Sequence, residues 1–167
     1  FNDEIRIPPY LINYKNETPN LKIPPSRTKE FMSSIINQND DFILVNKDPE
    51  LSVHSGTNNQ FGLIDIARAK FPSFEIDLCH RIDKSTSGCL LLSKNKKFLR
   101  HFHKELQNNR VEKIYEAILK GVMKKDIRIE TNINLSTKEH HHKVQESLDG
   151  KKAVSKFKIL KKYNSFT

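Results

Sequence analysis

A nine-residue segment rich in polar side chains, residues 80–88, constrains this chain more than any other part of its sequence. It brings together an imidazole, a guanidinium, a carboxylate and several hydroxyl groups, and the apolar residues 89–92 follow at once. A short apolar run of this kind predicts a buried strand. A carboxylate that stands just before such a strand, as Asp83 does, is held at the edge of a core, where reactive side chains are usually supported. The alternative is a solvated loop in which Asp83 only caps a turn.

Two other segments, residues 61–71 and 95–109, carry apolar residues at helical spacing. Asn95 fits the N-cap position of the second of these helices. Seven further segments have the apolar runs or the alternation expected of strands: residues 42–46, 51–54, 88–93, 112–120, 127–135, 143–147 and 153–160. This order of elements predicts an α+β domain whose sheet is mixed and largely antiparallel and is flanked by helices.

The distribution of proline suggests where the globular part begins. Five of the seven prolines lie within residues 1–30, where apolar residues are few, so an extended linker is expected over most of residues 1–40. The globular domain is expected to span residues 41–167, a length that can bury a core.

The sequence holds no apolar run of 18 residues, so no membrane span or membrane partner is expected. Cys79 and Cys89 lack zinc-type spacing, and reduced thiols in a cytoplasmic protein are expected.

The basic charge of the chain is concentrated in its second half. The net charge is +9 at neutral pH, and residues 1–93 contribute −2 to it. Residues 94–137 contribute +6 and residues 138–167 contribute +5. A one-sided basic surface suits a polyanion, most often nucleic acid, and Lys94 to Lys104 would form a basic rim along one helix. The alternative is a lysine-rich surface that only keeps the protein in solution.

Several familiar sites are absent from the sequence. It contains no glycine-rich phosphate-binding loop and no Gly-x-Ser-x-Gly nucleophile turn. Three consecutive histidines, residues 140–142, could bind a metal ion, but neighbouring positions on a strand point to opposite faces, so at most two could ligate one ion without a bend. A solvated loop is the preferred interpretation of these histidines, and no metal site is predicted.

The polar segment resembles the signature of a known enzyme family. It reads His80-Arg81-Ile82-Asp83, two further residues, then Thr86-Ser87-Gly88. Large-subunit ribosomal RNA pseudouridine synthases carry His-Arg-Leu-Asp, two variable residues and Thr-Ser-Gly, so only Ile82 departs, and conservatively. Other segments match that family in order and approximate spacing: residues 43–47, 53–54, 61–62 and 113–117, with residues 6–9 resembling one branch of it. The resemblance implies the pseudouridine synthase catalytic fold, present here in part.

The chain also departs from the family pattern. Family members usually continue Asn-Lys with Pro-x-Gly, whereas residues 48–50 read Asp-Pro-Glu here, a change that affects the turn rather than the chemistry. Similar members carry an RNA-binding S4 domain upstream, and residues 1–7 resemble its last strand. They also carry a downstream arginine-rich motif whose basic group pairs with the catalytic carboxylate, and that motif is expected beyond Thr167. The resemblance therefore implies a truncated catalytic domain that is inactive by itself.

The same resemblance implies roles for the residues of the polar segment. Asp83 would be the essential carboxylate in the isomerisation of specific uridines to pseudouridine in large-subunit ribosomal RNA. It could add to the sugar or the base, or remove a ribose proton, and these alternatives stay open. Arg81 would fill the gap left by the flipped base. Tyr115 would stack beneath the uracil, the alternative being an ordinary tyrosine of the sheet core. Three remaining residues would shape the loop or touch phosphates: His80, Thr86 and Ser87.

The implied reaction needs no cofactor, because it involves no net redox change. The implied partner is large-subunit ribosomal RNA, whose backbone the basic rim and the strands after Lys143 would follow. A monomer is expected. Two rival interpretations remain: a non-catalytic RNA-binding fragment, and a synthase that acts on transfer RNA.

Overall fold

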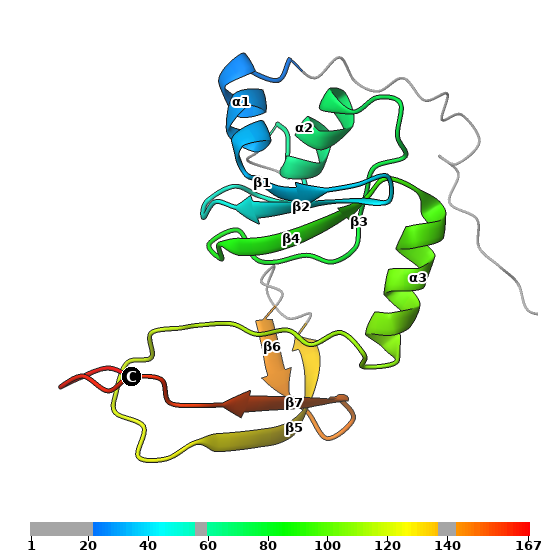
Figure 1. Ribbon diagram of the computed structural model, residues 1–167. Coiled ribbons are helices and arrows are strands. Elements are labelled where there is room, and N and C mark those ends of the chain that lie inside the picture. Colours follow the sequence, from blue (N-terminus) through cyan, green and yellow to red (C-terminus); the bar gives the residue numbers. More distant parts are fainter. Residues whose placement is uncertain (1–21, 56–59, 137–142) are drawn as a thin grey trace, which may run out of the picture. The chain divides into compact units, whose positions relative to one another are not determined.

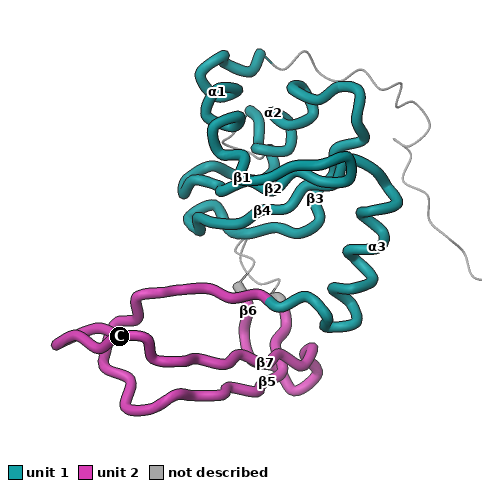
Figure 2. Tube along the Cα trace, in the orientation of Figure 1, with its two compact units in different colours: residues 1–112 teal, residues 113–167 magenta. Residues whose placement is uncertain are grey.

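The computed structural model describes residues 22–55, 60–136 and 143–167, and the chain divides into two compact units, residues 1–112 and residues 113–167 (Figure 2). Helices and antiparallel strands make up the described residues, which places the fold in the expected α+β class (Figure 1). Every strand pairing in these residues is antiparallel, so the parallel component of the expected mixed sheet does not occur among them.

The first unit is built on a four-stranded sheet in the order β1-β2-β4-β3. Its strands are β1 (Ile35–Gln38), β2 (Phe42–Lys47), β3 (Asp77–Leu78) and β4 (Gly88–Ser93). The two central strands pair in continuous register from Phe42 opposite Ser93 to Lys47 opposite Gly88. The apolar runs at residues 42–46 and 88–93 are therefore strands, as predicted, and they lie side by side.

Two helices, α1 (Pro25–Ser33) and α2 (Leu63–Lys70), lie next to each other over one face of this sheet (Figure 1). Phe31 of α1 is 2% exposed and belongs to the same core as the apolar residues of α2, β2 and β4. Helix α1 and strand β1 occupy part of the stretch that was expected to be a linker. The reason is that a proline at the first position of a helix favours its start rather than an extended chain, and Pro25 takes that position.

Helix α3 (Lys96–Gln107) follows β4 and confirms the helix predicted over residues 95–109. The side chain of Asn95 accepts a hydrogen bond from the Phe98 N–H (2.8 Å), which is the predicted N-cap. The helix contacts β3 and β4, and the Phe98 ring stacks on Phe42 at 5.6 Å between centroids. Among the described helices, none is long and apolar enough to cross a membrane.

The second unit contains a three-stranded sheet in the order β6-β5-β7. Its strands, β5 (Ile127–Ser136), β6 (Lys143–Glu146) and β7 (Lys151–Phe157), confirm three of the predicted segments to within a few residues. All the buried side chains among the described residues belong to the first unit, so none of the described side chains of this sheet is buried.

Two predicted strands are wrong. The backbone carbonyls of Ser52 and Val53 accept hydrogen bonds from the Leu63 and Ile64 N–H groups, so residues 51–54 cap helix α2 instead of joining a sheet. Residues 112–120 have the side-chain alternation of a strand, but a strand also needs a partner. Backbone pairing begins only at Leu119, which exchanges two hydrogen bonds with Thr167 (2.8 and 3.0 Å).

Candidate active site

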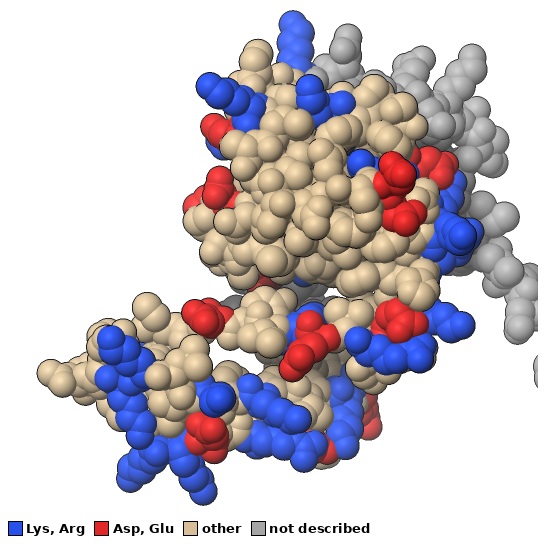
Figure 3. All heavy atoms as spheres, viewed as in Figure 1, with Lys and Arg blue, Asp and Glu red and all other residues tan. Residues whose placement is uncertain are grey.

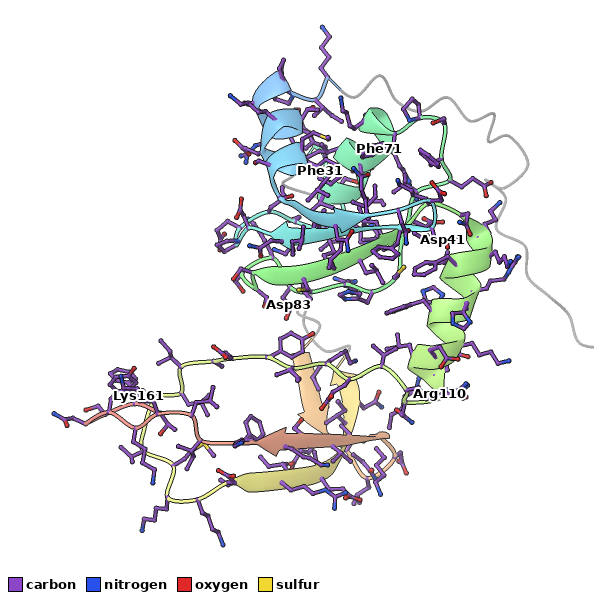
Figure 4. The ribbon with its side chains drawn as sticks, in the orientation of Figure 1. Phe31, Asp41, Phe71, Asp83, Arg110 and Lys161 are labelled. Carbon is purple, nitrogen blue, oxygen red and sulfur yellow. The ribbon has the colours of Figure 1, made fainter. Side chains whose placement is uncertain are left out.

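The polar segment forms a loop that joins β3 to β4, and both of its ends are fixed. The Cys79 N–H donates to the Leu91 carbonyl (3.0 Å), which extends the pairing of the sheet into the loop. Ile82 is 8% exposed and anchors the middle of the loop in the core. The Thr86 N–H closes a turn on the Asp83 carbonyl (3.1 Å). The Asp83 side chain is exposed and points away from the sheet (Figure 4), so its carboxylate can meet a ligand while its backbone is held.

His80 is turned toward the protein. Its Nε2 accepts a hydrogen bond from the Leu91 N–H (3.2 Å), so that nitrogen carries no proton. Its ring stacks against Phe102 of α3, with centroids 6.1 Å apart. Of the two roles expected for His80, these contacts support the shaping of the loop.

Lys47, at the end of β2, is the most unusual residue near the loop. Its side chain is fully buried, and its ammonium donates to the carbonyls of Asp48 (2.9 Å), Leu51 (3.0 Å) and Lys84 (3.0 Å). Burial lowers the pKa of Lys47, while the carboxylates of Glu50, Asp48 and Asp83 oppose that shift. Lys47 therefore ties the turn that follows β2 to the residue that follows Asp83.

No role was expected for Lys47 from the sequence, although a signal for its burial was present. Ile43 and Val45 alternate with exposed or half-buried neighbours and point into the core, and Lys47 continues the same parity. A lysine at an inward position of a strand predicts a buried ammonium that needs oxygen partners. Which oxygens those are depends on the fold of two loops, and strand parity does not contain that information.

Glu50 occupies the position where the family usually has glycine. Its φ is 66°, in the left-handed region that favours glycine. The Glu50 N–H donates to the Lys84 carbonyl (2.8 Å), and its carboxylate lies 3.7 Å from the Lys84 ammonium. Residue 84 is thus held from two sides, by Lys47 and by Glu50.

The structure places five of the six expected site residues on this one loop. Arg81, Asp83 and Ser87 are exposed, and Thr86 and His80 are half-buried. Tyr115 belongs to the second unit, where its side chain is 61% exposed, so it is not an ordinary tyrosine of a sheet core.

One residue of the expected basic rim has a different role. Lys94 is 8% exposed, its ammonium donates to the Asn39 carbonyl (2.6 Å), and it lies 4.8 Å from the centroid of the Phe74 ring. These contacts make it a structural residue, because a buried ammonium bonded to protein oxygens does not face a ligand. The exposed rim on α3 therefore begins at Lys96.

Within the described residues, no group of His, Cys, Asp and Glu side chains is arranged to hold a metal ion. The three histidines at residues 140–142 lie outside those residues.

Bacterial relatives match this chain over nearly its whole length. The chain is 33% identical to ribosomal large subunit pseudouridine synthase C of Vibrio parahaemolyticus and 32% identical to the protein of the same name from Haemophilus influenzae, in each case over 99% of this chain and 52% of the relative. The chain thus spans about half the length of these curated relatives. Both relatives belong to the branch that residues 6–9 resemble.

Solved structures agree in fold. Human RNA pseudouridylate synthase domain containing 4 superposes with a TM-score of 0.68 at 22% identity, over 84% of this chain and 59% of that chain. Human RNA pseudouridylate synthase domain containing 1 superposes with a TM-score of 0.56 at 26% identity, over 74% of this chain and 48% of that chain. The RNA pseudouridylate synthase family itself matches residues 41–167. This chain therefore belongs to the RNA pseudouridylate synthase family.

Proposed function

We propose that this chain carries the reactive loop of an enzyme that isomerises uridines of large-subunit ribosomal RNA to pseudouridine, with Asp83 as the essential carboxylate. The observation that carries the proposal is an exposed carboxylate on a loop fixed from several sides. The Cys79 N–H, the buried Ile82 and the Lys47 ammonium hold the backbone on both sides of Asp83. Catalysis depends on such rigid support of a reactive group.

The reaction breaks the bond between ribose C1′ and uracil N1 and joins C1′ to C5, while C5 loses a proton and N1 gains one. A carboxylate can assist by adding to the sugar or the base, or by removing a ribose proton. Each route needs an ionised Asp83 in a site from which water is excluded, and a cation nearby stabilises that ionised form. We assign this cation to the arginine-rich motif expected in a chain of the relatives' length.

Arg81 and Tyr115 are further residues that we propose to contact the substrate. Arg81 is exposed two residues before Asp83, where a planar guanidinium can stack in the gap left by a flipped base. Tyr115 is exposed and so can offer its ring to the uracil. Thr86 and Ser87 lie on the same loop and would contact phosphates. We further propose that the enzyme is monomeric and cytoplasmic and carries an S4 domain upstream. The ribosomal RNA substrate is in keeping with the names of the relatives.

The test compares Asp83→Asn with the unaltered protein in a chain of the relatives' length. Both proteins are incubated with ribosomal RNA, and pseudouridine is mapped by carbodiimide labelling. The substitution removes the ionisable oxygen, so we expect a loss of roughly 10²–10⁴-fold in rate. Asp48→Asn, which removes a carboxylate from the neighbouring turn, is the matched control and should stay near the unaltered rate. Equal rates for Asp83→Asn and the unaltered protein would remove Asp83 from the mechanism.

The rival interpretations separate in the same assay. A non-catalytic RNA-binding protein, which the net charge of +9 favours, would bind ribosomal RNA without producing pseudouridine. A parallel incubation with transfer RNA distinguishes the two substrate classes. Residues 1–167 alone should form no product, and turnover by them would contradict the need for a downstream cation.

A further inference from the structure

The second unit carries most of the positive charge of the protein. Residues 113–167 contain 13 Lys and Arg against 6 Asp and Glu, a net charge of +7, whereas residues 1–112 have a net charge of +2. Figure 3 shows many basic side chains over this unit. Charge of one sign at this density in about one third of the chain repels itself, and a polyanionic ligand relieves the repulsion.

The register of the sheet divides the side chains of β5 and β7 between two faces. Ile127 pairs with Phe157 and Ile129 with Ser155, which places these side chains on one face together with Ala153. Arg128 pairs with Lys156, and Asn132 pairs with Lys152 on the opposite face. We call this second face, whose charged residues are Arg128, Glu130, Lys152 and Lys156 and which also carries Asn132 and Val154, the basic face.

The charges of the basic face are only partly compensated. Glu130 forms ion pairs with both Arg128 (2.8 Å) and Lys152, and these cations lower the pKa of its carboxyl. Lys156 has no ion-pair partner among the described residues, and the residue directly opposite it on β5 is Arg128, a second cation. Like charges at opposite positions of two strands destabilise the pair. The basic face therefore keeps a net charge of +2 and gains from an external anion.

We propose that the basic face of the β5–β7 sheet is a docking surface for the phosphate backbone of RNA, separate from the Asp83 loop. The choice of RNA rests on the proposed function. Lys152 and Lys156 are about 13 Å apart along one strand, so they line a path rather than a point, which suits a chain of phosphates. A membrane surface suits the site less well, because membrane docking needs apolar and basic side chains on the same face. Here Val154, opposite Glu130, is the one large apolar side chain of β5 and β7 on the basic face, whereas Ile127, Ile129 and Phe157 lie on the opposite face.

The test uses the 167-residue chain and a fluorescein-labelled single-stranded RNA, with binding measured by fluorescence anisotropy. Lys152→Glu and Lys156→Glu should each weaken binding by roughly five- to tenfold at about 0.1 M salt. Each should also reduce the slope of log Kd against log salt by about 0.7, the value for one lost contact to a single strand. Lys151→Glu is the matched control, because it makes the same charge change on the adjacent residue of β7 but on the opposite face. It should change the affinity by less than about twofold.

Glu130→Gln provides a prediction of opposite sign. It removes the only acidic side chain of the basic face, so the affinity for RNA should rise by roughly twofold or more. The far-ultraviolet circular dichroism of each variant shows whether the sheet is kept. Vesicles of phosphatidylserine and phosphatidylcholine replace RNA in a parallel titration, and tighter binding to them would overturn the choice of RNA. Equal weakening by Lys151→Glu and Lys152→Glu would overturn the assignment to one face.

The results separate the docking surface from the proposed activity, because either one can be contradicted while the other stands. If Lys152→Glu and Lys156→Glu weaken RNA binding but the full-length protein makes no pseudouridine, the docking surface stands and the proposed activity falls. If pseudouridine is formed through Asp83 and the basic-face variants bind RNA as the unaltered protein does, the activity stands and the docking surface falls.

Discussion

At the scale of single residues, the sequence motif identified the loop, whereas the structure identified what holds it. Asp83 could be predicted as a candidate because a motif is a local pattern, and all of its members lie within nine residues. The contacts of Lys47 could not, because they join β2 to two loops that are far apart in the sequence. His80 is an intermediate case, since its place in the motif was visible but its bond to Leu91 depends on the pairing of β3 with β4.

The first prediction concerns the buried ammonium of Lys47. Lys47→Met keeps an unbranched side chain of similar length but removes the ammonium donor from three backbone carbonyls, of which only the Lys84 carbonyl keeps another donor among the described residues, the Glu50 N–H. Loss of hydrogen bonds to a charged group in a buried site should lower the free energy of unfolding by about 2–4 kcal/mol. Urea unfolding followed by circular dichroism measures this loss. Lys70→Met, an exposed lysine on α2, is the control and should change stability by less than about 0.5 kcal/mol. A similar value for both variants would show that the Lys47 contacts contribute nothing.

The second prediction concerns the two cysteines that flank the loop. Cys79 is 1% exposed, and burial raises the pKa of its thiol to about 12, whereas Cys89 is exposed. A raised pKa keeps the thiol protonated, so at pH 9 the thiolate fraction of Cys79 is about a thousandth, far below that of an ordinary thiol. Titration of the folded protein with a thiol reagent at pH 8–9 should therefore label one cysteine rapidly. Cys89→Ser should abolish that phase, and persistent rapid labelling of Cys89→Ser would mean that Cys79 is accessible.

At the scale of elements, helices and strands were predicted correctly where the local sequence pattern was sufficient to specify them. Helices α2 and α3 and strands β2 and β4 were predicted because their apolar periodicity is strong and their ends carry caps or breaks. Residues 51–54 and 112–120 were predicted as strands and are not, because a strand forms only where a partner offers its backbone. Helix α1 was missed because its prolines were interpreted as a linker, although proline also starts helices.

The third prediction belongs to the start of α2. A Cβ added to Gly62 would lie 2.4 Å from the carbonyl carbon of His54 and 2.6 Å from the Val53 oxygen. Backbone atoms cannot move aside as side chains do, so Gly62→Ala should push α2 away from residues 53–54. We expect a loss of about 1–3 kcal/mol in the free energy of unfolding, measured with urea. Ala69→Ser, on the exposed side of α2, should cost less than about 0.5 kcal/mol, and a Gly62→Ala variant as stable as this control would contradict the close approach.

At the scale of the whole molecule, stability and charge are unevenly distributed. The first unit contains the buried apolar cluster, whereas the described side chains of the second unit are at most half-buried. The second unit also carries +7 of the net charge of +9. A sheet with little buried apolar surface and strong self-repulsion has a low free energy of opening.

The last prediction follows from this imbalance and is measured by hydrogen exchange. Backbone amides of β2 and β4 should exchange only through global unfolding, because their strands lie in the core. Amides of β5 and β7 should exchange faster by local opening. Addition of RNA should slow exchange in β5 and β7, because a ligand that binds the folded sheet stabilises it in proportion to its occupancy. Lys156→Glu should reduce that protection while Lys151→Glu preserves it. Equal protection of all four strands without RNA would show that the second unit is stabilised by something other than burial within its own sheet.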